Sequence, residues 1–236
     1  MNNRATPVWE PVRARTMVDA AVDAIVAGAA RGLILPGDRI IESQIAEKLG
    51  VSRVPVREAL RMLEMQGIVS SIPNKGIRLT PVTRERVRDL LEARIALELV
   101  ALRRMVEGGK QKSPEFLKRL RHRIDVIELM VTRQDYYELA LADVAFHREI
   151  VDIAGNEAVR HLWEGTARQL VIILGLTTGM ADLRKTVDEH REVYDAVEKG
   201  DLAELERVWT EHINKQSLEI DYEKIISERR EQMSAG

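Results

Sequence analysis

The sequence predicts a mainly α protein with two parts: a small N-terminal module of helices and strands, and a larger C-terminal part that is almost entirely helical. Two observations support this prediction. Within residues 42–79, two short helices separated by a tight turn precede two apolar segments that flank a polar turn. From residue 84 to about residue 228, apolar residues recur at helical spacing, and no second strand-rich stretch appears.

The local signals of the N-terminal module are explicit. Residues 16–30 carry a helical apolar stripe. The first helix of the pair that follows ends at Gly50, because glycine readily adopts the left-handed conformation that closes a helix. Ser52 is a candidate N-cap of the next helix. Pro55 is tolerated in the first turn, where no intrahelical donor is lost.

The second helix of the pair has a cationic outer face. Arg53, Arg57 and Arg61 recur every four residues and therefore project from one side of the helix. The polar turn between the two apolar segments consists of Asn74, Lys75 and Gly76. Two helices followed by a β-hairpin predict a winged helix-turn-helix.

Charge is distributed unevenly along the chain. The net charge of −2 combines residues 1–80, with 11 Lys and Arg against 8 Asp and Glu, and a remainder with 25 against 30. Residues 48–78 alone hold 6 basic and 2 acidic side chains. A basic module joined to an acidic one favours nucleic-acid binding by the first part. The alternative is that the spaced arginines form an ordinary solvated helix face.

Composition excludes several classes of function. The chain has no cysteine, which excludes disulfides, thiolate metal sites and cysteine nucleophiles and suits a cytoplasmic protein. The longest apolar run, residues 170–174, is too short to span a bilayer, and no secretory signal follows Met1. We therefore expect no membrane partner. No nucleotide-binding glycine motif is present.

We predict five segments along the chain. These are a flexible arm at 1–13, a winged helix-turn-helix domain at 14–80, a linker at 81–84, an all-helical domain at 85–228 and a tail at 229–236. Glycine-rich or polar breaks divide the helical domain into about six helices. Their expected ranges are 84–107, 114–132, 135–153, 156–179, 183–199 and 201–228.

Four side chains of the helical domain form a candidate metal site. Asp143 and His147 stand four residues apart, so both can face one point from a single helix. His190 lies 10 residues before Gly200 and His212 lies 12 after it, which places them at nearly the same height in an antiparallel helical hairpin. Imidazole and carboxylate ligands suit zinc, nickel or a related divalent ion. The alternatives are a surface Asp–His pair and ordinary core or surface histidines.

The N-terminal module resembles a known family. Residues 49–60, together with Leu35-Pro36-Gly37 and Asn74-Lys75-Gly76, are similar to the DNA-binding domain of the GntR superfamily of bacterial transcription regulators. The resemblance implies that the start of the second helix of the module, the recognition helix and the wing tip contact DNA. The residues it nominates are Ser43, Ser52, Arg53, Pro55, Arg57, Arg61, Asn74, Lys75 and Gly76. Ser43 stands where members related to the fatty-acid regulator carry an arginine.

The helical domain extends the resemblance. Residues 142–147 and 154–156, with His190 and His212, are similar to the effector-binding FCD domain of the fatty-acid-regulator (FadR) branch, in its shorter, VanR-like form. The resemblance implies that Asp143, His147, His190 and His212 bind a metal ion that helps to hold a small carboxylate effector. It also implies that Arg94 points toward the effector cavity. The alternative for Arg94 is a salt bridge at the surface or at a dimer interface.

The sequence is compatible with three functions. The first is a regulator, not an enzyme, that binds double-stranded operator DNA as a homodimer, with a recognition helix on each half-site. The second is a metal-dependent hydrolase with a DNA-binding module, although no general base is evident beside the metal site. The third, an architectural DNA binder, leaves the metal site unexplained. The dimer is expected chiefly through the helix at 84–107 and one further helix. The apolar stripe of the first is broad: Val87, Leu90, Leu91, Ile95, Leu99 and Leu102.

Overall fold

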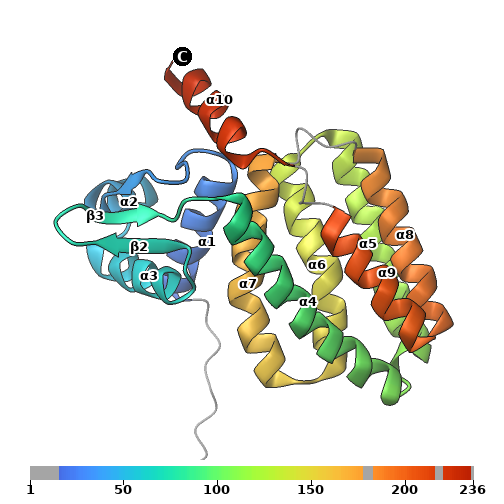
Figure 1. The fold of residues 1–236 in the computed structure, drawn as a ribbon. Helices are drawn as coiled ribbons and strands as arrows, with labels where there is room; N and C mark the ends of the chain where they lie inside the picture. The colour runs from blue at the N-terminus through green and yellow to red at the C-terminus, as the bar shows by residue number, and fades with distance from the viewer. Residues whose placement is uncertain (1–15, 178–182, 216–219, 235–236) are drawn as a thin grey trace, which may run out of the picture.

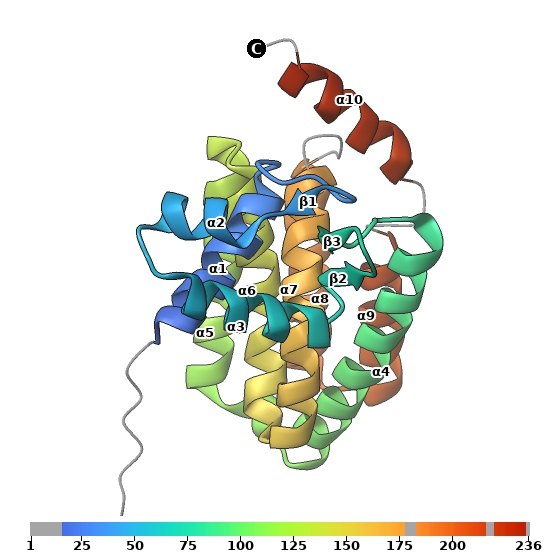
Figure 2. The ribbon, with the colours of Figure 1, turned by 90° about the vertical axis from the view of Figure 1, so that its left-hand side faces the viewer.

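The computed structural model describes residues 16–177, 183–215 and 220–234. A small module of helices and a short sheet lies beside a bundle of long helices, seen side by side in Figure 1 and with the module toward the viewer in Figure 2. This arrangement confirms the predicted fold class. The arm predicted at residues 1–13 and the break predicted from Gly179 to Asp182 lie outside the described residues.

The helices of the N-terminal module begin and end where the sequence signals lie. Its elements are α1 (Met17–Ala30), β1 (Arg39–Ile40), α2 (Glu42–Leu49), α3 (Arg53–Met65), β2 (Val69–Ile72) and β3 (Gly76–Leu79). Thr16 and Asp19 form a reciprocal capping box at the start of α1. Gly50 closes α2 with φ of 65°. Ser52 occupies the N-cap position of α3, but its hydroxyl makes no capping hydrogen bond.

The sheet has one more strand than the sequence predicts. The strand order is β1-β3-β2, and both pairings are antiparallel. β1 pairs Arg39 with Arg78, and β2 pairs Ile72 with Gly76 next to the turn. Asn74 has φ of 62° in this turn, a conformation that asparagine tolerates better than most residues. The predicted hairpin is therefore present, and β1 adds a third, two-residue strand.

The C-terminal part is a bundle of six long helices, which agrees with the predicted number. They are α4 (Arg84–Glu107), α5 (Pro114–Arg133), α6 (Tyr136–Ala154), α7 (Glu157–Thr177), α8 (Leu183–Lys199) and α9 (Leu202–Lys215), with a short 3-10 turn, η1 (Lys110–Lys112), between α4 and α5. Fully buried aromatic side chains, including Phe116, Phe146, Trp163 and Trp209, fill the bundle. Among the described residues, no helix is both long and apolar enough to cross a membrane.

The last predicted helix, 201–228, is two helices in the structure. α9 ends at Lys215, and a separate helix, α10 (Tyr222–Ser234), begins after Asp221, whose carboxylate accepts a hydrogen bond from the backbone N–H of Lys224. This cap starts a new helix and explains the difference. The predicted boundary between domain and tail at 228 therefore falls inside α10.

α10 reaches back to the N-terminal module. Arg230 donates a hydrogen bond to the Pro36 carbonyl at 2.8 Å and forms an ion pair with Asp38, also at 2.8 Å. Tyr222, at the start of α10, is buried. Figure 1 shows α10 leaving the bundle beside the upper end of α7.

The module packs directly on α7 and α4. A Cβ atom added at Gly175 of α7 would lie only 2.8 Å from the carbonyl oxygen of Ala30 in α1, so the two backbones are in close contact. Arg86 of α4 donates a hydrogen bond at 2.6 Å to the carbonyl of Gly67, just after α3. The N-terminal module thus contacts the bundle through specific backbone groups.

Candidate metal centre and nucleic-acid interface

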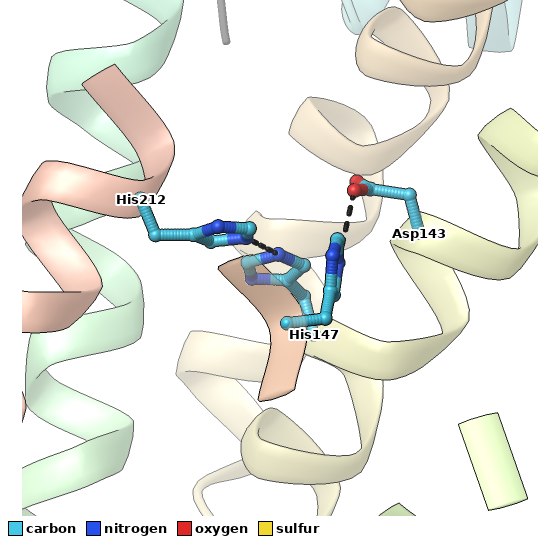
Figure 3. A group of neighbouring side chains, drawn as sticks. Asp143, His147 and His212 are labelled. Atoms are coloured by element: carbon cyan, nitrogen blue, oxygen red, sulfur yellow. Dashed lines mark hydrogen bonds and ion pairs between the residues drawn. The ribbon is translucent and has the colours of Figure 1, made fainter. Parts of the chain in front are cut away.

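The four side chains predicted to bind a metal ion meet inside the bundle. Asp143 and His147 come from α6, His190 from α8 and His212 from α9. All four are buried, and each offers a ligand atom within 4.8 Å of the others. Figure 3 shows Asp143, His147 and His212 pointing toward one another. The two other histidines, His122 and His161, are exposed and lie outside this group.

The contacts within the group leave three buried polar atoms without hydrogen-bond partners among the described residues. His190 Nε2 lies 3.2 Å from Asp143 Oδ1 but is not aligned for a hydrogen bond. Asp143 Oδ2 and His212 Nδ1 also lack a hydrogen-bond partner among the described residues. A buried polar atom without a partner costs about 1–3 kcal/mol. A bound cation would satisfy these acceptors, so the donor set fits a metal ion.

Two of the imidazoles have a defined hydrogen-bond orientation. His190 Nδ1 donates to the carbonyl oxygen of Thr186 at 2.7 Å, one helical turn earlier. His147 Nδ1 lies 2.9 Å from Glu98 Oε2. In both residues Nε2 is therefore the nitrogen available to a metal. His147 Nε2 lies 3.2 Å from His212 Nε2, a separation at which two lone pairs repel unless a proton or a cation lies between them.

The protonation states also suit metal binding. Burial lowers the pKa of His147 and lowers that of His212 well below its usual range, so both imidazoles are neutral near pH 7. Burial opposes ionisation of Asp143, but the His190 contact and the charge of Arg94 outweigh it and hold the carboxyl pKa well below its usual range. Two neutral imidazoles, those of His147 and His212, and one ionised carboxylate are therefore available, as zinc and nickel require.

Arg94 lies beside this group and is not at the surface. It is 1% exposed, and its Nε donates to Glu98 Oε1 at 2.9 Å. Its second guanidinium nitrogen, Nη2, lies 3.8 Å from Asp143 Oδ2 and has no hydrogen-bond partner among the described residues. The interpretation of Arg94 as a surface salt bridge is therefore wrong, although its partner is indeed a nearby acid.

Sequence reasoning missed three residues of this region. Glu98, Trp163 and Trp209 are completely buried, and both indole N–H groups donate to the Glu98 carboxylate. The spacing of Arg94 and Glu98, four residues apart on one helix, could have predicted their ion pair. No local signal indicates that tryptophans from two other helices meet the same carboxylate.

A small pocket lies beside His212, one of the four candidate metal ligands. It has a volume of about 70 Å³ and lies between α8 and α9. Its charged lining is mixed, with Glu189, Glu192 and Glu211 facing Arg207 and Lys215. Of the four candidate ligands, His212 is the one that lines this opening.

The residues nominated for DNA contact lie on α2, α3 and the turn between β2 and β3. Arg53 is exposed, whereas Arg57 forms a two-point ion pair with Glu42, with nitrogen–oxygen distances of 3.1 and 2.9 Å. Arg61 pairs with Glu58 at 2.9 Å. The remaining nominated residues are exposed at Ser52, Asn74, Lys75 and Gly76 and half-buried at Ser43 and Pro55.

A winged helix-turn-helix with exposed arginines on α3, joined to a helical domain with a buried polar site, is the architecture of a DNA-binding regulator. Family comparison agrees. Residues 18–79 match the model of the bacterial regulatory proteins of the gntR family, and residues 89–215 match the FCD domain. The chain belongs to the GntR family of transcription regulators, in the FadR-like group that carries an FCD domain.

Individual relatives support the same conclusion. The chain is 29% identical to the probable D-xylose utilization operon transcriptional repressor of Paenarthrobacter nicotinovorans, over 84% of this chain and 87% of that protein. It is 25% identical to the gluconate operon transcriptional repressor of Bacillus subtilis (strain 168), over 73% of this chain and 72% of that protein. These relatives are transcription regulators and not enzymes, so the hydrolase hypothesis is set aside.

Solved structures share the fold. McbR/YncC of E. coli superposes with a TM-score of 0.71 at 20% identity, covering 92% of this chain and 99% of that one. A GntR transcriptional regulator from Rhodococcus sp. RHA1 gives a TM-score of 0.67 at 20% identity, covering 89% and 97%.

Proposed function

We propose that this regulator binds operator DNA as a homodimer and is switched by a small carboxylate metabolite bound at a metal site in the helical domain. The observation that carries the proposal is the buried group of Asp143, His147, His190 and His212, whose ligand atoms lie within 4.8 Å of one another. Three imidazoles and a carboxylate favour zinc or nickel.

Arg94 supports the carboxylate part of the proposal. Its guanidinium is buried next to Asp143 and keeps one nitrogen, Nη2, without a hydrogen-bond partner among the described residues. Glu98 already pairs with Nε of this guanidinium, so Nη2 is the donor left for a hydrogen bond to a second anion. An effector carboxylate could bind Arg94 and the metal together, provided that the metal accepts five or six ligands.

α4 offers a route from this site to the DNA-binding module. The same helix carries Arg94, beside the metal group, and Arg86, which donates to the Gly67 carbonyl after the recognition helix. We propose that effector binding shifts α4 and changes the separation of the two recognition helices in the dimer. Couplings of this kind amount to about 1–3 kcal/mol, a change of roughly 5- to 150-fold in affinity.

The dimer is proposed because a two-fold symmetric operator has two equivalent half-sites, one for the recognition helix of each protomer. The apolar stripe of α4 gives it less support than the sequence indicates. Val87, Leu90, Leu91 and Leu102 are buried within one chain. Ile95 and Leu99 are partly buried against the same core. The stripe is therefore largely used in folding the protomer.

Three finer assignments belong to this proposal. The named repressor relatives favour repression of an operon for a small metabolite. Six bundle helices favour the shorter, VanR-like form of the domain. A bacterial protein that acts on operator DNA works in the cytoplasm.

The test is a double variant, His190→Ala with His212→Ala. Metal content by elemental analysis should fall to background after zinc or nickel reconstitution. Release from operator DNA by members of a small-carboxylate panel should be lost, while basal DNA binding remains. The matched control is His122→Ala with His161→Ala, which removes two exposed histidines and should change neither result. Wild-type protein that retains no metal after reconstitution would refute the proposal.

A further inference from the structure

We propose that Glu98 is the positioning residue of the metal site: its carboxylate fixes the tautomer of His147, so that Nε2 is presented to the metal. This inference rests on the metal site proposed above and assigns a role to a residue that binds neither metal nor effector. The role follows from four hydrogen bonds, the chemistry of their donors and the charge of Arg94.

Glu98 lies where four helices of the bundle meet. Its Oε1 accepts from Arg94 Nε at 2.9 Å and from Trp163 Nε1 at 2.6 Å. Its Oε2 accepts from Trp209 Nε1 at 2.7 Å and lies 2.9 Å from His147 Nδ1. The side chain is fully buried, so these four groups take the place of water.

The donors around Glu98 determine which nitrogen of His147 carries the proton. A guanidinium N–H and an indole N–H can only donate, and an ionised carboxylate can only accept. Arg94 Nε, Trp163 Nε1 and Trp209 Nε1 all donate to Glu98, so its side chain accepts as a carboxylate. His147 must then donate from Nδ1, and Nε2 keeps its lone pair.

Glu98 also compensates the charge of Arg94. The Arg94 guanidinium lies close to Asp143, where it would repel an incoming cation. The hydrogen-bonded carboxylate of Glu98 offsets this charge within the same buried region. A divalent cation therefore meets the negative charge of Asp143 without opposition from an unpaired arginine.

Glu98→Gln separates this role from simple packing, because glutamine keeps the shape but replaces one acceptor by an NH₂ donor. At the Oε1 position, the NH₂ group would face Arg94 and Trp163, which can only donate, so donors would face donors at both contacts. At the Oε2 position it would face Trp209 and His147, and the imidazole can change tautomer. The second orientation is less costly and forces His147 to accept at Nδ1 and carry its proton on Nε2.

The experiment has two readouts, the His147 tautomer by ¹⁵N-detected imidazole NMR in metal-free protein and the Zn²⁺ dissociation constant by chelator competition. Wild-type protein should show the Nδ1–H tautomer and Glu98→Gln the Nε2–H tautomer. Zinc affinity should fall about 10- to 100-fold in the variant, the usual effect of losing such a supporting group. The control is Glu206→Gln, which removes a partly exposed carboxylate paired with Arg103 and should change neither readout.

The outcomes separate this inference from the proposed function. If wild-type protein binds zinc tightly and Glu98→Gln binds it equally well, the role of Glu98 is refuted while the metal site stands. An Nε2–H tautomer of His147 in wild-type protein refutes it directly, whether or not the variant folds. Wild-type protein that fails to bind zinc, nickel or cobalt refutes both.

Discussion

Replacement of Gly175 by alanine tests the direct contact between the DNA-binding module and the bundle. A Cβ atom at this position of α7 would lie 2.8 Å from the carbonyl oxygen and 2.9 Å from the Cβ of Ala30 in α1. Side-chain carbons do not approach other atoms so closely, so α1 and α7 must move apart. Adding a methyl group to a well-packed contact costs about 1–3 kcal/mol.

The matched control is Gly28→Ala, two residues before Ala30 on α1. An added Cβ there would meet its nearest neighbour, Ile34 Cδ1, at 4.0 Å, which is an ordinary contact. Both substitutions remove a helical glycine and so gain up to about 1 kcal/mol of helix stability. The difference between the two variants therefore isolates the cost of close packing, about 1–3 kcal/mol.

The assay is the apparent melting temperature of the two variants, measured side by side in the same buffer. For a chain of this size each kcal/mol shifts the melting temperature by about 2–4 °C. Gly175→Ala should therefore melt roughly 2–12 °C below Gly28→Ala. Equal melting temperatures would show that α1 does not press on α7, and the packing of the two parts described above would be wrong.

Four further predictions concern the candidate metal site and the DNA and dimer interfaces. Replacement of Arg53 or Arg57 by alanine should weaken operator binding by about 1–3 kcal/mol and relax specificity at one base pair. Fluorescence anisotropy at fixed salt measures both effects. If neither variant loses affinity, α3 is not the helix that contacts the bases. The full chain and a fragment lacking residues 1–80 should both sediment as dimers, and a monomeric fragment would assign the interface to the N-terminal module. The pKa of Glu98 is lowered from 4.5 to about 2, so its ionised carboxylate should add about 3 kcal/mol to the free energy of unfolding above pH 4.5. This contribution should be lost as the pH falls toward 2, and urea unfolding at a series of pH values measures the loss. The burial-lowered pKa of His147 should keep zinc binding intact to lower pH than free imidazole allows, and a loss of affinity beginning above pH 6.5 would contradict this.

Much of the fold was accessible from sequence because its boundaries have chemical markers. Gly50, Gly155 and Gly200 all adopt positive φ where the sequence predicts breaks. The strand β1 was missed because two residues carry no alternation pattern. The break before α10 was missed because residues 201–235 contain neither glycine nor proline. A helix that ends without such a residue leaves little trace in the sequence.

The metal group was accessible for a different reason. The four-residue spacing of Asp143 and His147, and the equal distances of His190 and His212 from the Gly200 turn, are local geometry. The ring centroids of His190 and His212 lie 4.6 Å apart, as the hairpin geometry requires. The environment of Glu98 depends instead on how α4 packs against three other helices, and no spacing in one segment contains that information.

The contact of α10 with the N-terminal module limits how that module can move. The module already rests on the bundle where Gly175 of α7 meets Ala30 and where Arg86 of α4 donates to the Gly67 carbonyl. Arg230 adds a further contact, at Pro36 and Asp38, from the helix that follows the one carrying His212. Each added contact removes a direction in which the module can tilt against the bundle. Removal of α10 would therefore leave the module held by α7 and α4, with more freedom to tilt.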